Sequence, residues 1–264
     1  MALGLGIGVY WATNLAGGGG FDADYQAVLD RSNALGYTAP SEAQKTLQNT
    51  LVTDLKTAGV WDKLDALYIT ANDGSREFGR LNWVSPSTFE LSEVNSPAFT
   101  SNEGFTGNGS SSTLDTGITL DTNTTHFSTT NKEGSFGGWS YNVKIGGGPA
   151  LMGTDTSRND IRGGTNDNIM GVKAGYGISI TGLYHMNALP NGTNITATQY
   201  ANGSAVITAV GGPAPYITDT MHLLSEGGVA SFSADTISVA FIGGDLSAEA
   251  SDLYDAFNTY MSAL

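Results

Sequence analysis

The chain has 264 residues, a formal net charge of −14, no cysteine and only 14% charged residues. Its acidity argues against nucleic-acid binding, because a phosphate backbone would be repelled. The missing cysteines exclude a disulfide framework and thiolate chemistry. Hydrophobic residues, at 40%, suffice for a folded core. The abundance of Gly, Ser, Thr and Asn is typical of β-proteins with many turns.

Residues 1–20 carry no charged side chain and end in four glycines, Gly17–Gly20. Aliphatic residues alternate with glycine over residues 3–9, so an extended chain would have one aliphatic face and one bare face. Such a strand needs a groove, a sheet edge or neighbouring copies to cover it. We therefore expect a docking arm with a glycine tether. The arm residues are Leu3, Leu5, Ile7, Val9, Tyr10 and Trp11.

Three other interpretations fit this segment less well. A secretory signal peptide has a basic first region, whereas no Lys or Arg precedes Arg31. A transmembrane helix needs roughly 20 apolar residues, and alternate glycines oppose a helix. A disordered tail fits the glycine content but has little need for Tyr10 and Trp11. We expect no membrane span.

Residues 21–62 are expected to form a helical hairpin. Asp22 is suited to cap the first helix, and Gly36 to end it. Ser41 and Gln44 have the spacing of a capping box at the start of the second helix. The apolar stripe of this hairpin predicts packing against the rest of the protein.

Residues 63–264 are expected to form an antiparallel β-sandwich, because many short β-type segments follow one another without intervening helices. The Asn202-Gly203 pair joins two alternating runs and predicts a type I′ hairpin. An amphipathic helix over 247–262, capped by Ser247, would close the domain. The clearest expected strands are Ala66–Thr70, 126–130, 136–144, 168–173, 176–185, 193–200, 203–210, 220–224 and 236–242.

Three segments carry a family resemblance: GVWDKLDALYI at 59–69, GFTGNGSSSTLDTGI at 104–118 and ISVAFIGGDLSAEASDLYDAF at 237–257. Together they resemble structural proteins of tailed phages that carry a concanavalin A-like, or laminin G-like, jelly-roll domain. The resemblance covers roughly residues 20–264. It implies a jelly-roll β-sandwich, a virion location and no catalytic residues, and it extends to tail fibres, head fibres and capsid decoration proteins alike.

No pattern in the sequence predicts catalysis, a cofactor or a metal. Glycosidases that retain configuration need two carboxylates about 5–5.5 Å apart, whereas Glu90 and Glu93 are expected on opposite faces of a strand as a solvated pair. The segment 113–119 resembles a single sialidase Asp-box, but no arginine cluster accompanies it. The histidines lack the spacing of a zinc site. They are His126, His185 and His222.

A carbohydrate-binding role is the alternative function. Lectin sites combine an aromatic platform with Asp and Asn side chains, and often a Ca²⁺ ion held by oxygens. The segment 155–168 is rich in such side chains and shortly follows two aromatic residues. A solvated loop with Asx turns is the competing interpretation. The possible glycan-binding residues are Trp139, Tyr141, Asp155, Asn159 and Asp160.

The resemblance, together with the uncharged arm, therefore implies a non-enzymatic structural component of a phage virion. Its partners would be other virion proteins and sister copies in a homo-oligomer, with no nucleic acid among them. The alternative is a lectin-like domain that recognises a host-surface glycan.

Overall fold

The structure is a computed structural model of the chain. No helix in the part of the chain that it describes is long and apolar enough to cross a membrane. The described residues are 20–127, 133–141, 150–153, 160–162, 167–169, 172–174, 181–211 and 220–264.

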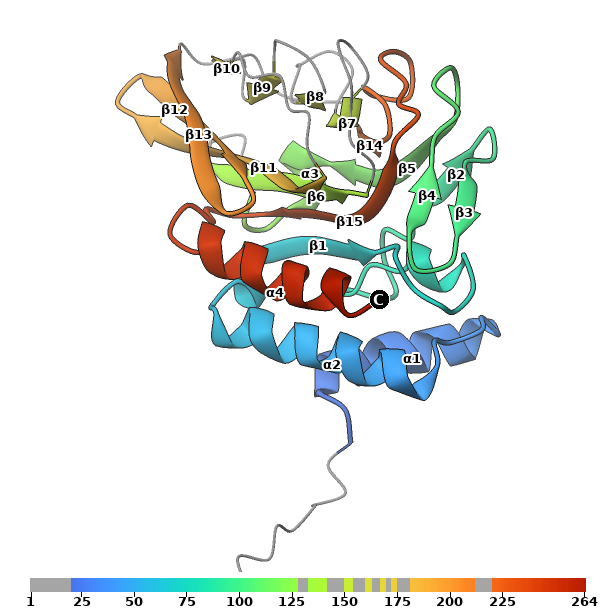
Figure 1. Ribbon diagram of the computed structural model, residues 1–264. Helices are drawn as coiled ribbons and strands as arrows, with labels where there is room; N and C mark the ends of the chain where they lie inside the picture. Colours follow the sequence, from blue (N-terminus) through green and yellow to red (C-terminus); the bar gives the residue numbers. More distant parts are fainter. Residues whose placement is uncertain are drawn as a thin grey trace, which may run out of the picture.

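Two antiparallel sheets face each other and form a β-sandwich (Figure 1). The first sheet has eight strands in the order β13-β12-β11-β6-β15-β4-β3, with β1 also paired to β15, and the second has seven in the order β10-β9-β8-β7-β14-β5-β2. Strands far apart in the chain are neighbours, so the chain crosses repeatedly between the sheets. The predicted class, a mainly-β antiparallel sandwich of the jelly-roll type, is confirmed.

The strands and helices have the following bounds. The first sheet contains β1 (Leu64–Ile69), β3 (Ala98–Thr100), β4 (Gly104–Thr106), β6 (Gly134–Ser140), β11 (Gly182–Asn191), β12 (Asn194–Ala201), β13 (Ser204–Gly211) and β15 (Thr236–Gly243). The second contains β2 (Ser92–Val94), β5 (Thr113–Thr119), β7 (Ala150–Gly153), β8 (Asp160–Arg162), β9 (Asp167–Ile169), β10 (Val172–Ala174) and β14 (Thr220–Leu223). The helices are α1 (Ala23–Leu35), α2 (Glu42–Thr57), α3 (Leu120–Asn123) and α4 (Ala250–Ser262), with 3₁₀ turns η1 (Trp61–Lys63) and η2 (Phe78–Arg80).

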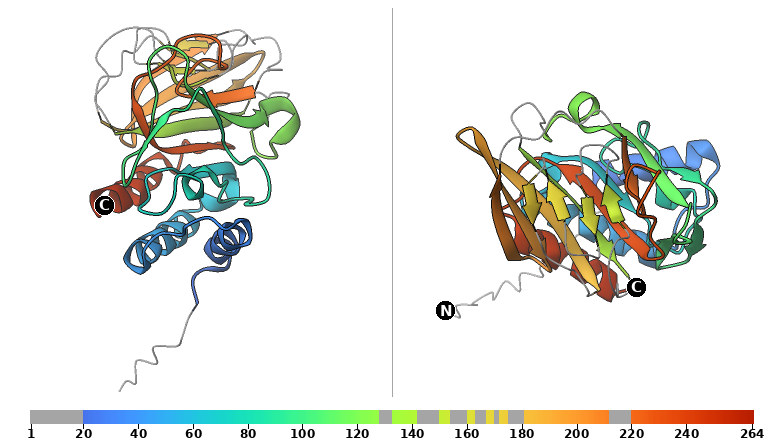
Figure 2. Two further views of the ribbon diagram at one scale, coloured as in Figure 1. Left: turned by 90° about the vertical axis from the view of Figure 1, so that its right-hand side faces the viewer. Right: turned by 90° about the horizontal axis from the view of Figure 1, so that it is seen from above.

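Helices α1, α2 and α4 form a third layer on the face of the first sheet that is turned away from the second sheet (Figures 1 and 2). Two apolar cores result. One lies between the sheets and includes Phe105 and Phe136. The other lies between the first sheet and the helices and includes Trp83, Phe241 and Phe257. The first sheet is therefore covered on both faces, and every residue of β15 is buried.

Side chains on the helix side of the first sheet form rows across β11, β6 and β15, because strand pairing brings residues of one face side by side. One row joins Leu183, Trp139 and Val239. The next joins His185 and Phe241, with a glycine of β6 between them. The first row is apolar and the second is largely aromatic.

The third row is polar and fixes the turn that leads into α4. The Asn187 amide donates to Asp245 Oδ1 at 2.9 Å, and its oxygen accepts the Leu246 N–H at 3.0 Å. The same oxygen accepts the hydroxyl of Ser135 on the neighbouring strand. These bonds satisfy a buried amide and set where the chain leaves β15 for α4.

The predicted caps of the helical hairpin are present. The Asp22 carboxylate accepts a backbone N–H of the first turn of α1 at 3.0 Å, and α1 ends at Gly36. The Ser41 hydroxyl accepts the Gln44 N–H at 3.3 Å. The Gln44 side chain does not return to Ser41, because Asp73 takes the Ser41 N–H at 2.9 Å and gives its own N–H to Gln44 Oε1 at 2.6 Å. Ser41 and Gln44 thus tie the start of α2 to Asp73 in the loop after β1 and do not form a reciprocal capping box.

The hairpin predicted at Asn202-Gly203 is confirmed. These residues have φ angles of 47° and 76° and join β12 to β13. Both central residues of a type I′ turn require a positive φ, which Asn and Gly adopt most readily.

The prediction of a strand at 126–130 is wrong for residues 126 and 127, which are the described part of this range. The carboxylate of Asp65 accepts the backbone N–H groups of residues 125–127 at 2.6 to 2.8 Å. A side chain therefore occupies the donors that a strand ladder would use. Residues 128–130 lie outside the described part of the chain.

Two other expected boundaries also differ. The expected strand at 168–173 is a hairpin of β9 and β10, in which Val172 pairs with Ile169. Helix α4 begins at Ala250 and not at 247, with Glu249 at the N-cap position. The backbone N–H of Ser247 donates to Asp245 Oδ1 at 2.9 Å, so Ser247 belongs to the turn before the helix.

Candidate functional site

Most of the predicted docking and glycan-binding residues fall outside the described part of the chain. This holds for the whole arm. It also holds for two of the possible glycan-binding residues. The residues concerned are Leu3, Leu5, Ile7, Val9, Tyr10, Trp11, Asp155 and Asn159.

Trp139, the predicted sugar platform, packs on the helix side of the first sheet. Its ring stacks on that of Tyr254 from α4, with centroids 6.1 Å apart and planes 6° apart. Trp139 is half-buried and borders the core between the first sheet and the helices. One face of the indole is thus used in joining β6 to α4.

Tyr141 lies two positions after Trp139 in the chain, whereas the backbone of Asp160 lies in the other sheet. Tyr141 follows β6 directly, is 40% exposed and donates its backbone N–H to the Thr236 carbonyl at 2.9 Å. The backbone of Asp160 lies in β8 of the second sheet, on the opposite side of the first sheet from α4 (Figure 1). The strand order therefore places Trp139 and the backbone of Asp160 in different sheets, and Asp155 and Asn159 lie outside the described residues.

Glu90 and Glu93 converge on two arginines and are not a solvated pair on opposite faces of a strand. Arg80 donates to Glu90 at 3.0 Å and to Glu93 at 3.3 Å, while Arg76 forms a two-pronged contact with Glu93. The hydroxyl of Tyr37 donates to Glu90 at 2.9 Å. The expectation failed because β2 begins only at Ser92, so Glu90 lies before the strand and strand alternation does not relate it to Glu93.

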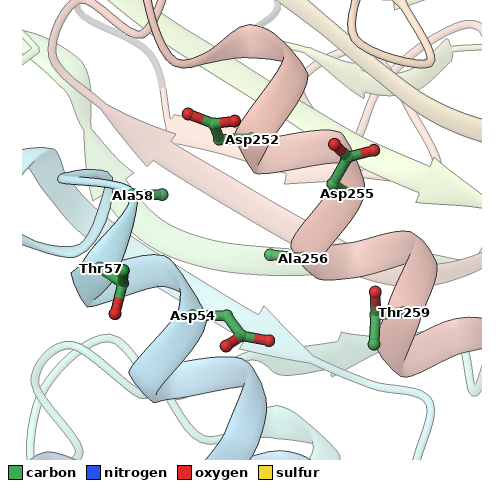
Figure 3. Close-up of a pocket in the computed structure, with 7 residues that line it drawn as sticks. All are labelled: Asp54, Thr57, Ala58, Asp252, Asp255, Ala256 and Thr259. Carbon is green, nitrogen blue, oxygen red and sulfur yellow. The ribbon is translucent and has the colours of Figure 1, made fainter.

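A groove of about 350 Å³ lies between α2 and α4 (Figure 3). The methyl groups of Ala58 and Ala256 face each other across it, which lets the two helices approach. Carboxylates from both helices surround the gap. Within the described residues, no group of three or more His, Asp and Glu side chains could hold a metal ion. The groove is an acidic surface, lined by Asp54, Thr57, Ala58, Asp252, Asp255, Ala256 and Thr259.

The end of the first sheet formed by β11, β12 and β13 is uncharged. The sequence has no Asp, Glu, Lys or Arg between Lys173 and Asp219, a stretch that includes all three strands. The last of them carries an aliphatic side chain, Val210, that is 56% exposed. In a chain with a formal charge of −14, this end of the sheet and the arm are both segments without charge. The uninterrupted run of uncharged residues was visible in the sequence, but only the strand order shows that it forms one end of a sheet.

A scan of the sequence against protein-family models finds no match. A search of curated proteins also finds no match.

Several solved structures are similar. One is a Trypanosoma rangeli sialidase mutant displaying trans-sialidase activity, with 12% identity and a TM-score of 0.49 over 82% of this chain and 39% of the sialidase. Another is the same organism's sialidase in complex with sialic acid, with 12% identity and a TM-score of 0.47 over 81% of this chain and 39% of that one. A third is domain 4 of AbnA, a GH43 extracellular arabinanase from Geobacillus stearothermophilus, in complex with arabinotriose, with 13% identity and a TM-score of 0.45 over 73% of this chain and 98% of that domain. This chain thus spans well under half the length of the sialidases that it matches.

Proposed function

We propose that the chain is a non-enzymatic structural subunit of a phage virion, part of a tail fibre, a head fibre or a capsid decoration, and anchored through residues 1–20. The observation that carries the proposal is the segregation of charge. An otherwise acidic chain keeps charged side chains out of its first 20 residues and out of one whole end of its first sheet.

Charge segregation of this kind supports a role in assembly. Copies with a formal charge of −14 repel one another and stay soluble. Charged residues are depleted where interfaces are fully buried, because their desolvation is costly. The uncharged arm and the uncharged end of the sheet are therefore the parts of the chain best suited to be covered by a partner.

Several described carboxylates form ion pairs or hydrogen bonds that hold the structure together. Their use in the fold supports a non-enzymatic role. Glu90 and Glu93 are held by arginines. Asp65 is used by backbone donors. Asp22 caps α1 and pairs with Lys56 at 2.6 Å, and this contact keeps the pKa of Asp22 below its ordinary value.

The virion role is tested on purified particles. Phage particles from a lysate that contains the chain are banded on a density gradient and probed with antibodies against it. We expect the protein to band with the particles, and a full-length L5D/I7D variant to drop to background because its arm carries charge. A V229K variant changes a 61% exposed valine outside the arm and should band like the wild type. Absence of the wild-type chain from the particles would refute the proposal.

Glycan binding is a second candidate function, and one observation favours it. Tyr141 is an exposed aromatic residue that lies two positions from half-buried Trp139. Aromatic side chains offer large rigid contact area with a polar tip. On a glycan array, a signal from the wild type that Y141A loses and V229A keeps would support this role. No signal from the wild type on a broad array would count against it.

A further inference from the structure

We infer that the outer edge of β13 accepts residues 3–11 of a second copy as an added strand. This inference rests on the proposed docking role of the arm and names its acceptor. The evidence lies in how the ends of the two sheets differ.

Three of the four sheet ends in the described part of the chain are short. Strands β3, β10 and β2 each have three residues. The fourth end, β13, has eight residues and lies at the rim of the molecule (Figure 2, right). Very short edge strands are one way in which proteins prevent strand addition. Strand β13 lacks this protection because it is long.

Strand β1 is covered along its outer side, and strand β2 is charged as well as short. The outer side of β1 is blocked, because the Leu67 N–H donates to Asn82 Oδ1 at 3.1 Å and the Leu67 carbonyl accepts the Trp83 N–H at 2.8 Å. Strand β2 carries Glu93, which is paired with Arg80. Covering an edge with a loop and placing charge on it are both known protections.

Within the described residues, strand β13 is neither short nor charged, and no backbone hydrogen bond covers its outer edge. Its sequence, SAVITAVG, contains no charge and no proline. It pairs with β12 on one side, and no described strand pairs with its other side. An antiparallel strand at a sheet edge leaves a row of backbone N–H and C=O groups available to another strand. Such an edge is the acceptor in β-strand addition.

The arm matches this edge in length and in pattern. Eight residues of strand extend roughly 26 Å, and residues 3–11 are long enough to follow them. Ile207 and Ala209 of β13 pack against the core between the sheets. In an added strand, the aliphatic side chains of residues 3, 5, 7 and 9 would continue that core. The intervening glycines would then lie on the other face of the sheet.

The occupant that fits is the arm of a second copy and not that of the same chain. The described chain begins at Gly20, close to α1 in the outermost helical layer, whereas β13 lies at the rim of the first sheet, beyond α4 (Figure 1). An arm reaching β13 of its own chain would have to pass around the helical layer. Two copies that exchange arms reciprocally form a closed pair, in which each edge is covered once.

The test uses full-length variants and light scattering behind a sizing column. The edge variant T208K/V210K places charge on exposed positions of β13 and keeps the arm intact. The arm variant L5D/I7D keeps the edge intact. The control L35K/V229K adds the same charge at two other exposed aliphatic positions. All four proteins are compared at one concentration and one ionic strength.

We expect the wild type and the control to have at least twice the monomer mass of 27.4 kDa. The edge and arm variants should each be monomeric. Mixing these two variants should restore a dimer, because one supplies an arm and the other supplies an edge.

Other outcomes overturn the inference in distinguishable ways. An edge variant that stays oligomeric while the arm variant is monomeric removes β13 as the acceptor but leaves the docking role of the arm. An arm variant that stays oligomeric while the edge variant is monomeric indicates that two β13 edges pair directly. A monomeric wild type overturns the exchange of arms between copies. The proposed function would then still be tested separately, by whether the chain is incorporated into particles.

Discussion

The imidazole ring of His185 stacks on the phenol ring of Tyr200, with centroids 4.4 Å apart and planes 4° apart. His185 is fully buried on the helix side of the first sheet, and neither ring nitrogen has a hydrogen-bond partner among the described residues. Burial lowers the pKa of His185 to about 3, because the charged ring would lose its hydration without gaining a partner.

This environment predicts that folding stability depends on pH through His185. The unfolded chain takes up a proton near pH 6.5, whereas the folded chain does so only near pH 3, so the free energy of unfolding decreases as the pH falls through this window. The largest slope from one such group is about 1.4 kcal/mol per pH unit. H185F should remove this slope, as measured by urea unfolding at several pH values.

The control for this experiment is H126Q, which changes a half-exposed histidine that contacts Asp65. It should keep the decline that His185 causes. An H185F variant that loses stability as steeply as the wild type between pH 6.5 and 3 would show that His185 is not the group responsible.

Gly137 makes the position of His185 possible. A Cβ atom at residue 137 would lie 2.4 Å from the Cβ of His185 and 2.3 Å from the Tyr184 carbonyl oxygen. We predict that G137A lowers the free energy of unfolding by about 3 kcal/mol, because overpacking forces backbone shifts. G20A meets nothing within 4 Å and should change it little. Equal stability of the two variants in urea unfolding would contradict this account.

Local signals in the sequence were sufficient for α1, α2 and one hairpin. Asp22, Ser41 and the Asn202-Gly203 pair act on their own neighbours, so their roles follow from spacing alone. The class of β-sandwich also follows from many short strands without helices between them.

The candidate sites depended on information that spacing does not contain. The first sheet is covered on both faces, so alternation could not show that Trp139 faces α4 and not a solvent-exposed sugar site. The convergence of Glu90 and Glu93 depends on where β2 begins, because Glu90 lies before the strand and Glu93 lies within it. The unprotected edge of β13 emerges only from the order of the strands.

Asp65 is predicted to hold the segment that follows α3. Its carboxylate, 4% exposed, accepts three backbone N–H groups from residues 125–127. We expect D65A to lower the free energy of unfolding by about 3 kcal/mol, since hydrogen bonds to a charged group contribute more than neutral ones. D65N should cost less because it retains one acceptor oxygen. The control is D62A, which changes an exposed residue. If D65A lowers the free energy of unfolding no more than D62A does, Asp65 does not hold this segment.

Variants of Trp139 and Tyr141 should separate the effect of packing from the effect of glycan binding. W139A removes the stack on Tyr254 and should lower the free energy of unfolding by about 2 kcal/mol, with W139F intermediate. Y141A changes an exposed side chain and should stay within about 0.5 kcal/mol of the wild type. Urea unfolding of the three variants measures both effects.

Unchanged stability in W139A would mean that the stack does not join β6 to α4. Because W139A alters the body of the protein, a loss of glycan signal in that variant alone cannot identify a binding residue, whereas a loss in Y141A can.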